Sequence, residues 1–208
     1  AELSRLHSQA PSHGYEHTKQ EVEQVLGKPI EISFETFERK SFASGSIAQV
    51  HLAKLDGRDV AVKVRHPKVV ERILADFSLM KALADFTARF PKLAWLNLKA
   101  SVAQFSATMV AQTRLDIEAE HIRRFAWNFG QWRDCGFPQV LLGSRTVLIE
   151  TFEQGTLLSR YTLDRSLGIG HCEEPLSKRQ AHFVVSRGED MYLKMLLVDN
   201  LMHADLHP

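Results

Sequence analysis

The chain has 208 residues, of which 44% are hydrophobic and 25% charged, the proportions of an ordinary globular protein with room for one large domain or two lobes. Its 26 basic residues nearly cancel its 25 acidic ones, so no overall field draws it onto nucleic acid or an anionic membrane. Two cysteines are too few for a disulfide framework and favour a reducing compartment. No apolar run approaches the ~20 residues of a membrane span, which predicts a soluble or peripheral chain.

The first part of the chain reads as a short helix followed by β-strands. A helix is expected over residues 15–26, because Gly27 and Pro29 follow it as stop signals. Segments 34–42, 46–55 and 59–65 are rich in β-branched and aromatic residues and predict strands. Asp56-Gly57 predicts a tight hairpin between the last two strands, since both residues tolerate a positive φ.

Helices and two further strands follow. Residues 68–90 repeat apolar side chains at helical spacing, and Pro91 ends that helix. Asn97 is a candidate N-cap for a second helix over residues 98–129. Strands are expected over residues 139–142 and 146–151, and Pro175 opens a last helix over 176–198.

One of these strands carries a lysine in an arrangement that suits a nucleotide. The alternation of residues 60–64 points three valines to one face and Ala61 and Lys63 to the other. A small residue beside a lysine suits a flat base lying over the sheet with the ammonium near its phosphates. The alternative is a solvated lysine on a half-exposed strand.

The segment before this strand has the position of a phosphate-covering loop. It reads A-x-G-x-x-A-x-V from Ala43 to Val50, where protein kinases have glycines at the alanine positions. The methyl groups of Ala43 and Ala48 predict a stiffer loop that approaches phosphates less closely. The alternative is a simple turn of small residues between two strands.

Several motifs together resemble the UbiB-like, aarF-domain family of atypical kinases. They are segments 44–51 (SGSIAQVH), 60–67 (VAVKVRHP), 118–121 (EAEH) and 203–208 (HADLHP), with 2–7 (ELSRLH) upstream. The resemblance covers nearly the whole chain, and the mitochondrial aarF-domain kinase 2 branch is nearest. It implies an α+β, protein-kinase-like, two-lobed fold. Residues 1–29 would be a helical lead-in that follows a K-x-G-Q segment lying before Ala1. Residues 30–151 would form the N-lobe, with an antiparallel sheet and family-specific helices, and residues 152–208 would form a partial C-lobe.

The resemblance also implies the site residues. Glu118 would pair with Lys63 and hold it on the phosphates of ATP, and Asp205 would orient or deprotonate the attacking hydroxyl. The remaining ATP-binding positions would be Ala43, Ser44, Gly45, Ser46, Ala48, Val50, Ala61 and Glu150, the last at the adenine edge. Glu118 is alternatively an exposed helix acid that pairs with Arg114. His203 and His207 have metal-like spacing, but Pro208 argues against a zinc site.

Some features depart from the family pattern. Gln112 and Arg114 stand where the family has the two acids of its E-x-D motif, and Arg114 is expected to compete with Lys63 for Glu118. The loop asparagine and D-F-G aspartate that hold Mg²⁺ would follow Pro208, so the 208-residue piece alone is expected to be inactive.

The resemblance further implies a role in coenzyme Q biosynthesis or lipid metabolism in mitochondria, with a plastid or bacterial cytoplasm as alternatives. Its expected partners are ATP, lipid or a membrane surface and coenzyme Q biosynthesis proteins, with no nucleic acid. Two other functions stay open. One is a small-molecule kinase of the aminoglycoside or choline type, which the alanine-containing loop disfavours. The other is a pseudokinase scaffold that binds nucleotide or lipid without turnover.

Overall fold

The structure is a computed structural model that describes residues 12–90, 95–156, 158, 161 and 176–202. The chain divides into two compact units, one ending at Glu153 and the other beginning at Gln154. The first unit is built on a sheet, and the described part of the second contains one long helix. The folding pattern is α+β, with a sheet whose strand pairs are all antiparallel, as expected.

The sheet runs in the order β1-β3-β4-β6-β5, and β2 pairs with β3 beside β1. Its strands are β1 Thr36–Phe37, β2 Ala43–Ser44, β3 Ala48–Leu55, β4 Arg58–Arg65, β5 Val140–Gly143 and β6 Val147–Thr151. Asp56 and Gly57 both have positive φ, 49° and 74°, at the turn between β3 and β4. The predicted hairpin is therefore confirmed, with the backbone that this residue pair favours.

In the described residues, five helices belong to the first unit and one to the second. They are α1 Tyr15–Leu26, α2 Ile30–Ser33, α3 Val69–Thr87, α4 Leu98–Gln112 and α5 Leu115–Asn128, followed by α6 Lys178–Leu197. Gly27 ends α1 in the left-handed conformation at φ 68°. Ser177 and Gln180 form a capping box at the start of α6. Asn97 precedes α4 as expected, but its side chain makes no capping hydrogen bond.

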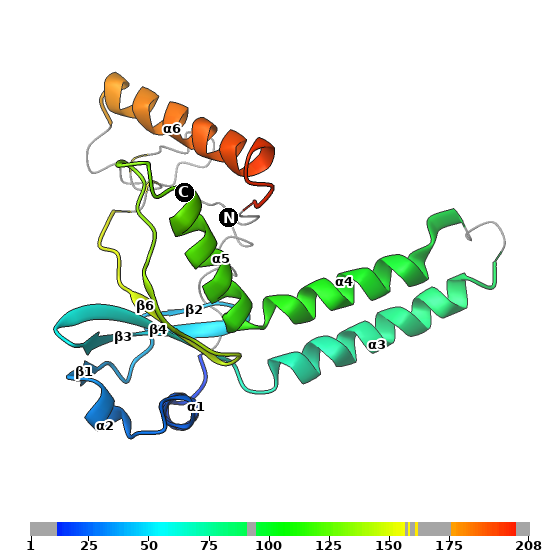
Figure 1. Cartoon of the computed structure of the whole chain (residues 1–208). Helices are drawn as coiled ribbons and strands as arrows, with labels where there is room; N and C mark the ends of the chain where they lie inside the picture. Colours follow the sequence, from blue (N-terminus) through cyan, green and yellow to red (C-terminus); the bar gives the residue numbers. More distant parts are fainter. Residues whose placement is uncertain (1–11, 91–94, 157, 159–160, 162–175, 203–208) are drawn as a thin grey trace. The chain divides into compact units, whose positions relative to one another are not determined.

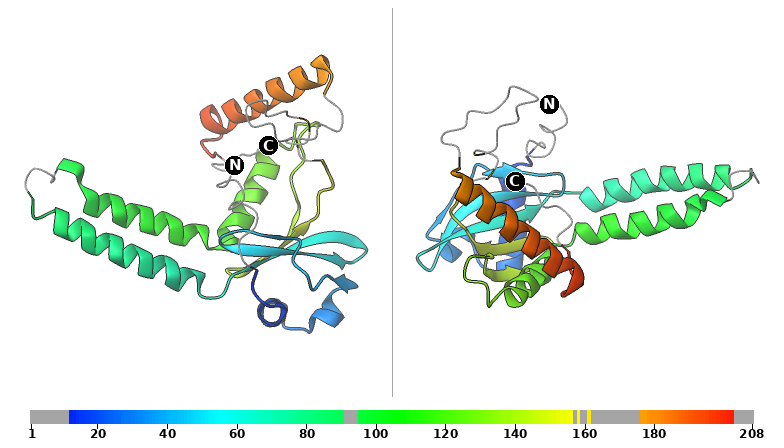
Figure 2. Two further views of the ribbon diagram at one scale, coloured as in Figure 1. Left: turned by 180° about the vertical axis from the view of Figure 1, so that it is seen from behind. Right: turned by 90° about the horizontal axis from the view of Figure 1, so that it is seen from above.

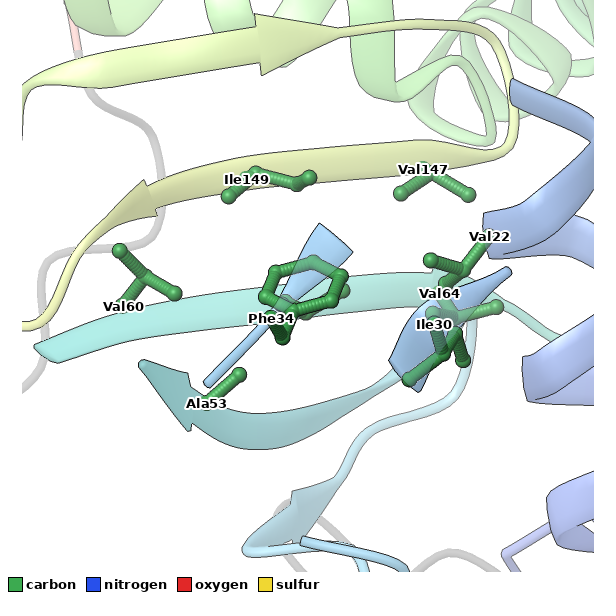
Figure 3. Packing of buried hydrophobic residues seen from close by; sticks show 9 residues of the cluster. Val22, Ile30, Phe34, Ala53, Val60, Val64, Val147 and Ile149 are labelled. Carbon is green, nitrogen blue, oxygen red and sulfur yellow. The ribbon is translucent and has the colours of Figure 1, made fainter. Parts of the chain in front are cut away.

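The two faces of the sheet are covered by different helices, with α1 and α2 below it and α5 above it in Figure 1. The lower face holds the main core, where the three valines of β4 pack with side chains of α1 and α2 (Figure 3). Its buried members are Val22, Ile30, Phe34, Ala53, Val60, Val62, Val64, Val147 and Ile149. On the upper face Leu115 and Ala119 of α5 pack on Leu148. The predicted alternation of β4 is thus confirmed, and it places Lys63 on the face that α5 covers.

The single helix expected over residues 98–129 is wrong, because the chain breaks between α4 and α5. Arg114 is extended, with φ −93° and ψ 104°. Thr113 is buried and its hydroxyl donates to the Val110 carbonyl, while the Leu115 N–H donates to the Arg145 carbonyl. Tertiary contacts with the turn before β6 therefore override the helical pattern and turn α5 onto the sheet.

Helices α3 and α4 lie side by side as an antiparallel pair (Figure 2). The rings of Phe77 and Phe105 meet edge to face between them, with centroids 5.3 Å apart. Neither these helices nor any other in the described part of the chain is long and apolar enough to cross a bilayer.

Candidate nucleotide site

Lys63 lies in β4 between two strands that hold it in place. It pairs in register with Val50 on β3 and with Leu148 on β6. Because opposite residues of an antiparallel pair point to the same face, these side chains and that of Ala61 share the upper face. Ala61 is a small residue beside the lysine and is 8% exposed.

The carboxylate that meets Lys63 comes from the first turn of α5. Lys63 Nζ donates to Glu118 Oε1, and the two side chains are 25% and 37% exposed. The pair joins residues 55 positions apart in the chain. The structure therefore brings together the lysine and the helix glutamate that sequence analysis singled out, at a partly solvated position where a further anion can reach the ammonium.

The close packing that carries Glu118 to this position involves two residues that sequence analysis missed. Ala119 is fully buried, and a methyl group built on Gly143 would come within 2.6 Å of its Cβ. Helix α5 can approach β5 this closely only because position 143 has no side chain. The alanine that follows Glu118 in the EAEH motif was the available signal, while nothing local marked Gly143.

The predicted phosphate-covering loop is a β-hairpin turn between β2 and β3. Gly45 N–H donates to the Ala48 carbonyl at 2.9 Å, and His66 binds the carbonyls of both Gly45 and Ile47. The backbone N–H groups of Ser46 and Ile47 donate to no acceptor among the described residues. In this turn the Gly45 and Ile47 carbonyls are hydrogen-bonded to His66, while the N–H groups of Ser46 and Ile47 have no acceptor among the described residues. Unpaired N–H groups of this kind suit an anion.

Glu150 occupies a half-buried position on the same face of the sheet. It pairs in register with Ala61, and its Oε2 is buried with no hydrogen-bond partner among the described residues. Burial raises the pKa of the Glu150 carboxyl; the nearby Lys63 acts against this shift, and Glu118 adds to it. An acid lacking a partner inside this face is available to a ligand with a hydrogen-bond donor.

Arg114 does not compete with Lys63, and the expectation that it would is wrong. Its guanidinium makes a two-pronged contact with Asp116, with Nε and Nη2 donating to the carboxylate at 3.1 and 2.6 Å. This hydrogen bond raises the pKa of Arg114 and holds the pKa of Asp116 below its usual range. Gln112 is the last residue of α4. No contact that the structure shows joins Gln112 or Arg114 to the Lys63–Glu118 pair.

The other site residues fall in two groups. Most of the predicted ATP-binding residues lie along β2, the turn and the adjoining strands: Ala43, Ser44, Gly45, Ser46, Ala48, Val50 and Ala61. Asp205 lies outside the described residues, as do His203 and His207. Within residues that are described, no group of three or more His, Cys, Asp or Glu side chains is placed to hold a metal ion.

Comparison with known proteins gives a consistent result. The family described as the ABC1 atypical kinase-like domain matches residues 5–208. Among curated relatives, the chain is 38% identical to the "Probable serine/threonine-protein kinase abkC" of Dictyostelium discoideum over 99% of its own length and 29% of that protein. It is 34% identical to the "ABC1 family protein YPL109C, mitochondrial" of Saccharomyces cerevisiae over 100% of its length and 33% of the relative. It is 32% identical to the "Probable protein kinase UbiB" of Vibrio cholerae over 96% of its length and 36% of the relative.

The chain therefore spans about a third of the length of these relatives. A solved structure titled as the complex of Rv3197 with erythromycin from Mycobacterium tuberculosis superposes with a TM-score of 0.74. At 23% identity it covers 99% of this chain and 49% of the other, so the two chains share a fold.

Proposed function

Because the chain belongs to the ABC1 atypical kinase-like family, we propose that it is the ATP-binding part of a kinase or ATPase of the UbiB type. In this proposal, residues 30–151 form the N-lobe after a lead-in of residues 1–29, and residues 152–208 begin the C-lobe. The observation that carries the proposal is the ion pair between Lys63 and Glu118, on the face of the sheet that also carries the small residue Ala61.

Lys63 supplies the positive charge at the phosphates. Its ammonium would bind oxygens of the α- and β-phosphates, and Glu118 would keep the ammonium aimed at them. Since Lys63 keeps 25% of its side-chain surface exposed, a phosphate can approach it without breaking the contact with Glu118. The arrangement is electrostatic positioning, which is the main contribution of protein groups in phosphoryl transfer.

The turn between β2 and β3 would cover the phosphates from the other side. The free N–H groups of Ser46 and Ile47 are donors for phosphate oxygens, and the methyl groups of Ala43 and Ala48 limit how far the turn bends. The base would lie against Ala61, and the Glu150 carboxyl would accept a hydrogen bond from the exocyclic amine of adenine. Guanine, with a carbonyl at that position, would be disfavoured.

Transfer itself needs groups that come later in the chain. By resemblance, Asp205 would orient or deprotonate the attacking hydroxyl. Mg²⁺ supplies charge neutralisation on the β- and γ-phosphates when it is bound, and the residues expected to hold it follow Pro208. Residues 1–208 alone should accordingly bind ATP but turn it over very slowly.

The names of two relatives support a proposal for the biological setting. The Saccharomyces protein is named as mitochondrial and the Vibrio protein as UbiB, which supports a role beside a mitochondrial membrane in coenzyme Q biosynthesis or lipid metabolism. Lipid and coenzyme Q biosynthesis proteins are the partners expected there, and the aarF-domain kinase 2 branch remains our assignment.

Calorimetric titration of the full-length protein with ATP tests the proposal. Lys63→Ala should weaken ATP binding at least about tenfold, because a charge-assisted contact to phosphate is lost. Lys54→Ala on β3 is the matched control and should bind as the unchanged protein does. Equal affinity of the Lys63→Ala variant would contradict the proposal. ATP binding without any consumption that depends on Asp205 would instead favour a scaffold.

A further inference from the structure

We propose that His66 and His13 are positioning residues for the phosphate-covering turn, linking the start of α1 to the Gly45 carbonyl through an ordered line of hydrogen bonds. This inference rests on the proposed function, since it assigns a purpose to the turn between β2 and β3. His66 follows the last residue of β4 and His13 precedes α1, so neither is among the ATP-binding positions described above.

His66 holds the turn at two points. Its backbone N–H donates to the Ile47 carbonyl at 2.8 Å, and its ring Nε2 lies 2.9 Å from the Gly45 carbonyl oxygen. Both carbonyls are therefore directed toward His66, which stands only three residues after Lys63 in the same strand region. The free Ser46 N–H shares one rigid peptide plane with the Gly45 carbonyl, so it keeps its direction only as long as that carbonyl stays bound to His66.

With a neutral His66 ring, the Gly45 carbonyl sets the direction of the hydrogen bonds between His66 and His13. The Gly45 carbonyl can only accept, so His66 Nε2 donates and, in a neutral ring, His66 Nδ1 accepts. His13 Nδ1 lies 2.7 Å away and must be the donor. His13 Nε2 is then an acceptor for the Thr18 hydroxyl at 3.0 Å, whose single proton also faces the acceptor His51 Nε2 at 3.2 Å.

The line is anchored in a buried polar cluster between α1 and the lower face of the sheet. Thr18, Gln49 and His51 are each at most 1% exposed. Gln49 Oε1 accepts from the His13 backbone N–H at 2.9 Å, and its Nε2 lies 3.0 Å from His51 Nε2. His51 Nδ1 donates to the Glu38 carbonyl at 2.8 Å, which fixes its tautomer as well.

The burial of so many polar groups for packing alone would be costly. Burial, followed by the neighbouring His17, His66 and His51, lowers the pKa of His13 to about 4, which keeps this ring neutral and able to accept from Thr18. Burial also lowers the pKa of His51. A second hydrogen bond joins α1 to the end of β4, because His17 Nε2 donates to the Arg65 carbonyl at 3.2 Å. The position of α1 is thereby coupled to the turn that faces the phosphates.

Two substitutions of His66 separate positioning from simple stability. His66→Gln places an amide N–H near the position of Nε2 and keeps the donor to the Gly45 carbonyl, while losing the acceptor for His13. His66→Asn keeps an acceptor near the position of Nδ1 but is too short to reach Gly45. Both remove the ring and should lower the unfolding temperature by similar amounts, so a difference between them in ATP binding reports on the turn.

The test measures the affinities of ATP and adenosine by calorimetry on the full-length protein, with the exposed His182→Gln as control. His66→Asn should weaken ATP binding about 3- to 10-fold and leave adenosine binding unchanged, while His66→Gln should bind ATP within about twofold of the unchanged protein. His13→Leu should give an intermediate loss, and it provides the test if the His66 variants do not fold.

Three results would overturn the inference: equal ATP affinities for the Asn and Gln variants, parallel losses for adenosine and ATP, or normal ATP binding by His13→Leu. Lys63→Ala measured alongside tells which proposal has failed. If it binds ATP normally, the proposed function is wrong. If it binds weakly while every histidine variant binds normally, only the positioning role is wrong.

Discussion

The Cβ of Ala119 on α5 lies so close to Gly143 on β5 that a methyl group at position 143 would come within 2.6 Å of it. This contact lies beside the residue that carries the Lys63 ion pair, because Glu118 immediately precedes Ala119. The distance from helix to sheet at this point therefore controls whether the carboxylate reaches the ammonium.

Gly143→Ala should push α5 away from the sheet and weaken ATP binding. The added methyl group meets backbone-proximal atoms that cannot rotate away, so helix or strand has to move. We expect a loss of about 1–3 kcal/mol in unfolding free energy together with a loss of ATP affinity, measured by thermal unfolding and calorimetry. Gly136→Ala is the control, since a methyl group there meets nothing within 4 Å. If Gly143→Ala leaves the ATP affinity unchanged, the packing of α5 on β5 does not control nucleotide binding.

Arg114→Ala should leave ATP affinity unchanged. The guanidinium is bound to Asp116 and not to Glu118, so its removal frees no partner of Lys63. The pair is solvent-exposed, so its loss should change the unfolding temperature little. A tighter or weaker ATP complex in this variant would restore the idea that Arg114 regulates the lysine pair.

Glu150→Met should raise stability and do so more strongly at neutral than at acidic pH. Because burial raises the pKa of Glu150, the folded state holds the proton more tightly than the unfolded state does. Unfolding free energy is then lost as pH rises from the usual carboxyl range through the raised pKa, and the variant escapes this loss. We expect a gain on the order of 1 kcal/mol, or about 2–4 °C in unfolding temperature, at pH 7.

Unfolding curves of both proteins between pH 4 and 8 provide the measurement. A stability difference that stays constant or shrinks as pH rises would mean that Glu150 has a partner when folded. In the same variant, loss of the preference for ATP over GTP would agree with the assigned contact to adenine.

The sequence could predict the parts of this fold that local chemistry decides. Alternation in β4 identified the side that carries Lys63, and Asp56-Gly57 identified the hairpin, because both depend on a few neighbouring residues. The break at Thr113 was missed because no glycine or proline marks it, and it depends on the remote carbonyl of Arg145. The role of Gly143 was missed for the same reason, since only the packed helix makes a methyl group there a clash.

The candidate site shows the same division. Lys63 and Glu118 were identified through motifs and lie together in the structure. His66 lay inside a quoted motif, but a motif does not show which carbonyl a ring will bind. The pairing of Arg114 was expected to follow the i, i+4 spacing of a continuous helix, and the extended backbone at Arg114 removed that spacing.

The most direct test of the central claim is chemical labelling of Lys63 by an acyl phosphate of ATP. In this reagent an amine beside the phosphates attacks the acyl carbon, the nucleotide phosphate leaves, and the amine loses a proton as it becomes an amide. Mass spectrometry should find the label on Lys63, strongly reduced by excess ATP, while label on Lys54 is unaffected by ATP. An unlabelled Lys63, or labelling that ATP does not suppress, would contradict the placement of nucleotide phosphates at the Lys63–Glu118 pair.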